Sequence, residues 1–362
     1  LGVLAGAALA ACARPSRPAS AGAPPVAPAS APPSALPALH HVGLNSVDPE
    51  RAIAWYLRVW PAARRVTIAG VPAVDADMLL LFDRVERPPP GAWRDDLHRA
   101  EPQSALWHIG AYTNTTDLAA RLRPAGVALL PLFTAPGDSV GVWRSGLAPY
   151  AGTRTAGQLD TATAAAPRPG GFAYAVAPDG VLFEFTGGPA TRDALSHVHL
   201  YHERPGCAAA WYAAHLGMPP TAPVACETVA GSPPSPPPAA AEASWPSLER
   251  IGTIRAPAAG VRLANGALAW YPRQCVGARC GGERPLVPSR GQALDHVALA
   301  VDGLEALLAR LRRAGVRVRE APHAGLSGRA AMIEGPDGLA IELLERPRRE
   351  PDASSSPASR SR

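Results

Sequence analysis

The sequence predicts an α+β fold built from four copies of one module, each made of a strand, a helix and a short antiparallel sheet. A strand start of the form X-His-apolar-X-apolar recurs at 40–44, 107–111, 196–200 and 295–299. A helical segment follows each of these strands, and a Pro-Asp-Gly turn with a short apolar strand closes the second and fourth copies. Such internal self-similarity is typical of a duplicated architecture.

The helical segments divide the four copies into two kinds. In the first and third copies the segment contains Ala-Trp-Tyr, with the tryptophan fourteen residues after the repeated histidine. In the second and fourth copies it ends at Gly126 and Gly315, where a helix C-terminus needs a positive φ. Asp48 and Pro49 predict the N-cap and the first turn of the first helix. The chain is therefore one two-module unit repeated.

The closing strands of the second and fourth copies each carry one acidic residue in an apolar run. Glu184 and Glu342 both stand four residues after the glycine of the Pro-Asp-Gly turn. An ionised carboxylate in an apolar layer is costly unless it is paired or bound to a metal. The repeated histidines are the candidate partners. Because side chains alternate along a strand, His41 shares the register of the other repeated histidines, and His40 is predicted to point away.

This arrangement resembles the vicinal oxygen chelate superfamily, which includes glyoxalase I, the extradiol dioxygenases and the bleomycin-resistance proteins. The resemblance covers residues 38–346. In that family two βαβββ modules pair their curved, mixed sheets into one cup, with helices outside and a divalent metal inside. The resemblance implies two such cups: a first domain over 38–190 from modules 1 and 2, and a second over 191–346 from modules 3 and 4.

The family takes its metal ligands from the first strand of each module and the last strand of the second. The ligands that this implies are two histidines and one glutamate in each cup: His41, His108 and Glu184 in the first, and His197, His296 and Glu342 in the second. Two imidazoles and one carboxylate form the facial triad that holds iron(II) and leaves positions open for substrate and oxygen. We therefore expect a divalent metal, with iron(II) favoured and zinc(II) or manganese(II) as alternatives.

The departures from the family's patterns bear on the reaction. Glyoxalase I takes a fourth ligand, a glutamate that also works as a base, from the last strand of the odd module. The corresponding stretches here, 77–85 and 266–273, have no acid inside the strand. Extradiol dioxygenases carry a tyrosine ten residues before the glutamate and a histidine upstream. The first cup has the tyrosine, Tyr174, and the second has the histidine, His323, with Met332 at the tyrosine position.

A third candidate for moving protons, His199, shares a strand face with the histidine two residues before it. We expect His199 to line the second cup, either as a proton donor or as a supporting contact. For Tyr174, packing in the core is an equally weighted interpretation. For His323, a solvated loop histidine is the simpler one.

The expected function is that of a metalloenzyme with dioxygenase-like chemistry on a small substrate that chelates through adjacent oxygens. Two alternatives stay open: a glyoxalase-like lyase or isomerase, and a non-catalytic protein that binds a small ligand, as bleomycin-resistance proteins do. A homodimer stays open as well. No nucleic-acid partner is expected, because the net charge of +5 comes from arginines scattered among acids, with no lysine.

Both ends of the chain are predicted to lie outside the fold. Residues 1–12 resemble an export signal ending in a lipobox, so we expect contact with a membrane only through a lipid anchor at Cys12, in the bacterial periplasm or cell envelope. Residues 13–37 are expected to form a Pro/Ala-rich tether, and 347–362 a disordered tail. The other four cysteines, an even number, suit an oxidising compartment and one or two disulfides.

Overall fold

The structure, a computed structural model, describes nine stretches of the chain: residues 35–91, 103–113, 121–127, 142–143, 172–187, 194–223, 225–226, 258–271 and 286–347. All of them belong to one compact unit. The predicted export signal, nearly all of the tether and nearly all of the tail lie outside the described residues. Within the described stretches, no helix has the length and apolar character needed to cross a membrane.

All four predicted modules are present, with their elements in the predicted order. Module 1 contains β1 (Ala38–Ser46), α1 (Pro49–Val59), β2 (Arg64–Ile68), β3 (Val71–Asp75) and β4 (Leu79–Arg84). Module 2 contains β5 (Leu106–Thr113), η1 (Arg123–Ala125), β6 (Val142–Trp143), β7 (Phe172–Val176), η3 (Pro178–Gly180) and β8 (Leu182–Gly187). Module 3 contains β9 (Ala194–Tyr201), α4 (Pro205–Leu216), β10 (Ala259–Leu263) and β11 (Gly266–Tyr271). Module 4 contains β12 (Leu294–Val301), α7 (Leu304–Arg313), β13 (Val318–Gly325), β14 (Gly328–Glu334), η5 (Pro336–Gly338) and β15 (Ala340–Glu345).

The local signals that predicted the helix ends are confirmed. The side chain of Asp48 accepts a hydrogen bond from the backbone N–H of Arg51, and Pro49 opens α1. Gly126 and Gly315 adopt φ values of 69° and 78°, in the left-handed region where glycine is favoured. These caps satisfy backbone groups that a helix end leaves without partners.

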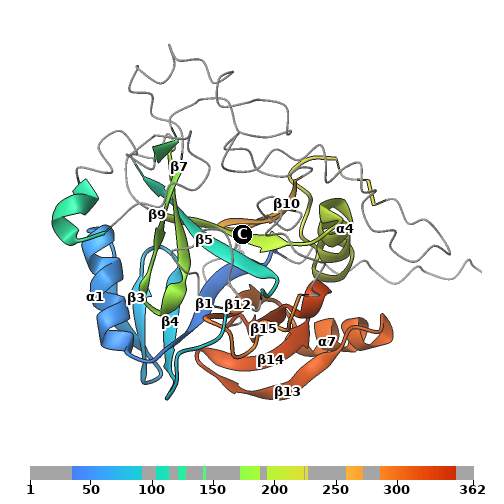
Figure 1. Cartoon of the computed structure of the whole chain (residues 1–362). Helices are drawn as coiled ribbons and strands as arrows, with labels where there is room; N and C mark the ends of the chain where they lie inside the picture. The colour runs from blue at the N-terminus through green and yellow to red at the C-terminus, as the bar shows by residue number, and fades with distance from the viewer. Residues whose placement is uncertain are drawn as a thin grey trace, which may run out of the picture. The chain divides into compact units, whose positions relative to one another are not determined.

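The strands form two mixed sheets, each with two first strands at its centre. One sheet has the order β13-β14-β15-β12-β1-β4-β3-β2, and the other has the order β10-β11-β9-β5-β8-β7-β6. The two first strands run antiparallel (β1 with β12, β5 with β9), and each also pairs in parallel with the last strand of its own module. Figure 1 shows blue β1 beside the red strands of module 4. We call these the outer-module sheet (modules 1 and 4) and the inner-module sheet (modules 2 and 3).

The predicted division into two consecutive domains, 38–190 and 191–346, is therefore wrong. Module 1 shares its sheet with module 4, and module 2 shares its sheet with module 3. All four modules lie in one compact unit. The prediction assumed that modules adjacent in sequence pair in space, which is the commoner arrangement but not a requirement. The predicted fold class, four modules in two paired-sheet cups, is confirmed.

Modules that are consecutive in sequence still contact each other through the Pro-Asp-Gly turns. The carboxylate of Asp179, in the turn of module 2, accepts hydrogen bonds from the hydroxyl of Ser46 and the backbone N–H of Val47 in module 1. In the second half of the chain, Asp337 of module 4 lies 3.8 Å from the imidazole of His202 in module 3. Each turn therefore links one sheet to the other.

One disulfide is present among the described residues. Cys207, in α4, is bonded to Cys226, which follows that helix. The expectation of at least one disulfide is confirmed, while Cys275 and Cys280 lie outside the described residues.

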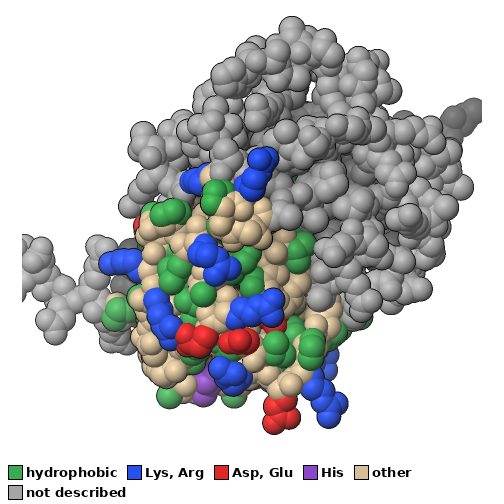
Figure 2. Space-filling model, turned by 60° about the vertical axis from the view of Figure 1, so that its left-hand side comes forward, with side chains coloured by type: hydrophobic (Ala, Val, Ile, Leu, Met, Phe, Trp, Pro, Cys, Tyr) green, Lys and Arg blue, Asp and Glu red, His purple; other side chains and the backbone are tan. Residues whose placement is uncertain are grey.

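Charged side chains on the described surface are dispersed. Figure 2 shows one face on which arginines are spread among hydrophobic and acidic side chains. Several exposed arginines are paired with an acid, including Arg64 with Asp75 and Arg65 with Glu50. The absence of a nucleic-acid partner stays a prediction.

Candidate metal centres

The outer-module sheet brings together one residue from each of three neighbouring strands. His41 lies on β1, His296 on β12 and Glu342 on β15, and all three are buried. Nε2 of His41 lies 3.1 Å from Nε2 of His296 and 3.3 Å from Oε2 of Glu342. The distance between Nε2 of His296 and Oε2 of Glu342 is 3.8 Å. We call this group the outer-module site.

The inner-module sheet carries a second group with one additional histidine. Oε2 of Glu184, on β8, lies 2.8 Å from Nε2 of His108 and 2.9 Å from Nε2 of His197. Nδ1 of His199 lies 3.7 Å from the same carboxylate oxygen. One ligand atom from each of the four residues falls within 4.8 Å of all the others. We call this group the inner-module site.

The structure groups the predicted ligands differently from the sequence prediction. His108 stays with Glu184, and His296 stays with Glu342, because each pair lies on neighbouring strands of one module. The odd-module histidines have exchanged places: His41 lies with the module 4 pair rather than with the module 2 pair, and His197 does the reverse. The exchange follows directly from the pairing of the sheets.

Both groups fit a divalent metal ion. Bonds from such an ion to nitrogen or oxygen are about 2.0–2.2 Å long, which places neighbouring ligand atoms roughly 3.0–3.6 Å apart. The distances between neighbouring donor atoms given above run from 2.8 to 3.8 Å. Among the described residues, Oε2 of Glu342 and Nδ1 of His199 are buried with no hydrogen-bond partner. Such buried atoms cost free energy, which a bound cation would recover.

The two glutamates differ in their electrostatic surroundings. Burial acts to raise the pKa of Glu184, but the hydrogen bonds and charges of His108 and His197 hold that pKa well below its usual value. At the outer-module site, burial raises the pKa of Glu342, and the opposing charges of nearby groups do not outweigh it. The difference arises because the inner-module glutamate has two imidazoles at hydrogen-bond distance.

Burial favours the neutral form of two site histidines, His41 and His199. Burial, followed by the nearby rings of His296 and His40, lowers the pKa of His41 well below its usual value. Burial also lowers the pKa of His199 well below its usual value, with His197 and His108 adding to the effect. Neutral imidazole is the form that binds a metal, so neither ring needs to lose a proton at pH 7.

The residue before the histidine contacts Nδ1 of the ring in three of the four first strands, and in β1 this residue is His40. Oγ of Ser196 lies 2.7 Å from Nδ1 of His197, and the carboxylate of Asp295 accepts a hydrogen bond from Nδ1 of His296 at 2.7 Å. Bonding at Nδ1 leaves Nε2 to face the site, as in many metal centres. Nδ1 of His108 has no hydrogen-bond partner among the described residues.

Asp295 belongs to a buried network that the sequence analysis missed. Its carboxylate also accepts hydrogen bonds from the guanidinium of Arg290 and the backbone N–H of Gly291, each at 2.6 Å. Burial acts to raise the pKa of this carboxyl, but the bonded His296, Gly291 N–H and Arg290 lower it to about 2. A negative charge is therefore fixed behind His296. The signal was visible in the sequence as an acid directly before the histidine of module 4.

His40 stays outside the ligand group, but its ring is not turned away from the ring of His41. Nδ1 of His40 lies 2.9 Å from Nδ1 of His41, and the two rings are in edge contact. The register of β1 against β12 shifts between Leu39 and His41, so His40 is the extra residue of a bulge, where simple alternation fails. It contacts the back of the His41 ring and stays outside the ligand group.

Two glycines, also missed from the sequence, allow the histidines to lie flat across the neighbouring strand. Gly43 pairs with His296, and Gly110 pairs with His197. A Cβ atom on Gly43 would lie 2.1 Å from Cε1 of His296, and one on Gly110 would lie 2.1 Å from Nε2 of His197. Any side chain at either position would displace the opposing ring. The signal was present as a glycine two residues after the histidine in modules 1 and 2.

The predicted proton-transfer residues take different positions. Tyr174 is fully buried on β7, opposite Glu184 in register, with its ring 5.2 Å from that of His108. His199 is part of the inner-module site. His323 is exposed on β13 rather than in a loop, and its ring lies 3.0 Å from the carbonyl of Ala321.

The sheet registers identify where a further carboxylate would stand in the odd modules. Glu184 and Glu342 pair with the residue two positions after the histidine of their own modules. The matching residues in modules 1 and 3 are Leu81 and Ala269. Neither can supply a ligand or a base.

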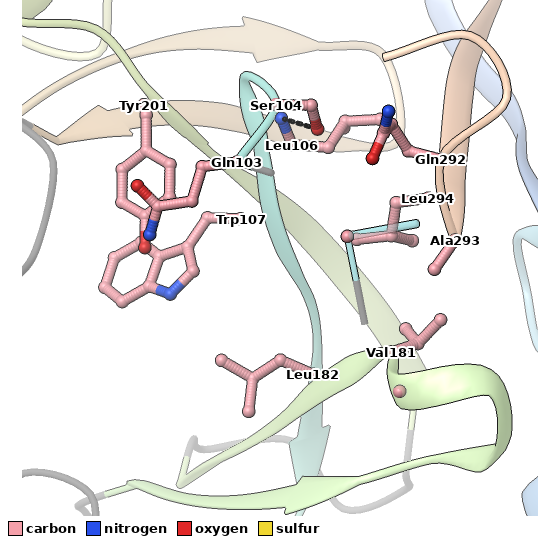
Figure 3. A pocket seen from close by; sticks show the side chains of 12 residues that line it. Gln103, Ser104, Leu106, Trp107, Val181, Leu182, Tyr201, Gln292, Ala293 and Leu294 are labelled. Atoms are coloured by element: carbon pink, nitrogen blue, oxygen red, sulfur yellow. Dashed lines mark hydrogen bonds between the residues drawn. The ribbon is translucent and has the colours of Figure 1, made fainter. Parts of the chain in front are cut away.

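A small cavity lies where the two sheets meet, and none of the site residues lines it. It is lined by Ser104 just before β5, by Leu106 and Trp107 of β5, and by Gln292 just before β12, as Figure 3 shows. Its volume is about 20 Å³, which is room for one water molecule. The cavity is too small for an organic substrate.

The fold and the two sites define a class of protein: paired-module cups with histidine and glutamate groups able to hold a divalent metal. Residues 194–343 match the family model described as Glyoxalase/Bleomycin resistance protein/Dioxygenase superfamily, the vicinal oxygen chelate domain. This match covers modules 3 and 4. No curated protein matches the chain in sequence.

Solved structures extend the likeness to all four modules. Glyoxalase I from Zea mays has a TM-score of 0.52 and 15% identity, with 85% of this chain and 92% of that chain covered. A protein described as "putative dioxygenase" from Bacillus subtilis subsp. subtilis str. 168 has a TM-score of 0.50 and 10% identity, with 87% of this chain and 86% of that chain covered. At these identities the likeness establishes the fold alone. The expected fold of the vicinal oxygen chelate superfamily is thereby confirmed, with duplicated modules.

Substituting either glycine should remove one metal site without affecting the other. Gly43→Ala should displace the His296 ring and Gly110→Ala the His197 ring, because the added Cβ overlaps each ring. We expect bound metal, measured by elemental analysis after loading, to fall from two ions per chain to one in each variant and to none in the double variant. Each single variant is the control for the other. Two ions retained in both would contradict the described geometry.

Asp295→Asn should weaken metal binding at the outer-module site while leaving the fold in place. The amide keeps the shape of the side chain but loses the charge that orients and polarises His296. We expect the affinity of one of the two ions to fall about 10–100-fold in a competition titration against a metal-binding dye. Ser196→Ala, which removes the contact with Nδ1 of His197 in the inner-module site, should instead affect the other ion. An unchanged affinity in Asp295→Asn would remove this residue from the metal centre.

Proposed function

We propose that the chain is a divalent-metal-dependent enzyme with dioxygenase-like chemistry, acting at the outer-module site on a small substrate that chelates through adjacent oxygens. The observation that carries the proposal is the convergence of His41, His296 and Glu342 within hydrogen-bond to ion-pair distances. A 2-His-1-carboxylate set occupies one face of a metal and leaves the other positions open. A metal held there would act as a Lewis acid and as a template for the substrate.

The surrounding residues would orient the site and exchange protons. Asp295 fixes the orientation of His296, so that Nε2 faces the metal position. His323 is exposed on β13, two strands from Glu342 in the same sheet. It would be the group that passes protons between substrate and solvent. Met332 pairs with Glu342 in register, as Tyr174 pairs with Glu184 in the inner-module site. The outer-module site therefore has no tyrosine at this position.

The same geometry ranks the alternatives. A glyoxalase-like lyase or isomerase is less favoured, because Leu81 and Ala269 occupy the positions at which an odd-module carboxylate would stand. A protein that binds a small ligand without a metal is less favoured, because it would leave Oε2 of Glu342 buried with no hydrogen-bond partner among the described residues. Iron(II) is the proposed metal, with zinc(II) and manganese(II) as competitors.

Glu342→Gln should abolish activity, and Glu184→Gln should not. The protein loaded with iron(II) under argon is mixed with a panel of ortho-diphenols, and oxygen uptake is followed with an electrode. We expect Glu342→Gln to lower uptake by at least about 100-fold, because even changes behind a metal ligand cost 10–100-fold. Circular dichroism of both variants verifies the fold.

Other outcomes would support one of the alternative functions or the other site. Turnover of a hemithioacetal without oxygen uptake would establish the lyase or isomerase alternative. A wild-type protein that binds no divalent metal would establish the binding protein. Activity lost in Glu184→Gln and kept in Glu342→Gln would move the reaction to the inner-module site.

We also propose that the chain works in an oxidising bacterial compartment, held to the membrane by an acylated Cys12. The Cys207–Cys226 disulfide supports an oxidising location, since such bonds are rare in the cytosol. In cells fed a labelled fatty acid, the wild-type chain should become labelled and Cys12→Ser should not. Absence of label in the wild type would refute the anchor, and a reduced Cys207 in thiol trapping would refute the compartment.

A further inference from the structure

We propose that the inner-module site is a closed, four-ligand metal centre that stabilises the fold, with Nδ1 of His199 as its fourth ligand. This role differs from the reaction proposed for the outer-module site. It shares with the proposed function only the binding of a divalent metal.

His199 occupies a position at which the outer-module site has no side chain. In the inner-module sheet His199 pairs with His108, and in the outer-module sheet the matching pair is Gly43 with His296. Side chains two residues apart on a strand share a face, so His199 and His197 point to the same side of β9. The two sites therefore differ by one imidazole at one equivalent position.

The ring of His199 is held close to the other ligands by its neighbours. Its centroid lies 4.5 Å from the ring of His108 and 4.3 Å from that of His197. On its other sides it contacts Trp107 and Tyr271, at centroid distances of 5.9 and 5.0 Å. This packing restricts the ring to an orientation in which Nδ1 is 3.7 Å from Oε2 of Glu184.

The Nδ1 atom of His199 lacks a hydrogen bond within the described part of the chain. It is buried, and the carboxylate oxygen 3.7 Å away is too distant for a hydrogen bond. A cation bound by His108, His197 and Glu184 would lie within reach of this atom, because all four donor atoms are within 4.8 Å of one another. The metal would thus satisfy the buried nitrogen.

The number of protein ligands separates the roles of the two sites. In zinc proteins, tetrahedral centres closed by four protein ligands are characteristically structural, whereas catalytic centres keep three protein ligands and an open position. The inner-module site joins β5, β8 and β9, the three central neighbours of its sheet, from two different modules. Only the folded chain brings these ligands together, so a metal that binds there stabilises the folded state over the unfolded state by mass action.

A cysteine placed at position 199 reports directly on metal contact. We expect cobalt(II) bound to His199→Cys to show a near-ultraviolet charge-transfer band from thiolate to metal, absent from the wild type and from His199→Ala. A thiolate within bonding distance produces this band, and a cysteine elsewhere does not. In His199→Ala we expect the tighter of the two cobalt sites to weaken at least about tenfold.

The stabilising role is tested by thermal unfolding with and without a chelator. The chelator should lower the Tm of the wild type, and His199→Ala should lose most of that shift. His296→Ala, the matched control in the outer-module site, should keep it. If His199→Ala fails to fold even with metal, His199→Cys serves in its place, and its charge-transfer band decides ligation.

Four results would overturn the inference or separate it from the proposed function. Two bound cobalt ions with no charge-transfer band in His199→Cys would exclude ligation. A Tm that the chelator leaves unchanged would exclude the stabilising role. A charge-transfer band in His199→Cys together with no oxygen uptake by the wild type would support this inference and contradict the proposed reaction. A wild type that binds no metal would overturn both.

Discussion

The structure depends on a histidine ring lying directly across a glycine of the antiparallel neighbour strand. His296 over Gly43 and His197 over Gly110 set the register of the two central strand pairs, and with it the position of every other ligand. Strand register is strongly specified wherever one face is buried, because a shift by one residue would turn each ligand away from its site. Two small residues therefore determine where six buried polar side chains meet.

The same architecture produces two chemically different sites. The outer-module site has three candidate ligands and an ionised aspartate, Asp295, behind one of them. The inner-module site has Trp107 at the position of Asp295, a serine, Ser196, behind His197, and the additional imidazole of His199 on β9. Duplication supplied two equal frames, and substitutions at equivalent positions gave each a different ligand number and charge. This divergence is local, because the strands that carry both sites keep the same pairing pattern.

Local features of the fold and site were predictable from the sequence, and the partnership between modules was not. Strand starts, helix caps and the unusual glutamates follow from residues close together in the chain, so their patterns predict them. The choice of sheet partner does not, since Gly43 would face a histidine equally well whether module 1 paired with module 2 or with module 4. The bulge at His40 was also hidden, because it arises where β1 pairs with the distant β12. The network around Asp295 was visible in the sequence, since Arg290, Gly291 and His296 all lie within five residues of it.

The pairing of module 1 with module 4 sets the order in which the two sheets can form during synthesis. The inner-module sheet joins modules that are consecutive in the chain, so its strands can pair as soon as module 3 has emerged. The outer-module sheet joins the first module to the last, and His41 and His296 are separated by 255 positions. Closing so long a loop is slow, and β1 has no β12 to pair with until module 4 has been made. One edge of β1 therefore stays unpaired until all four modules are present.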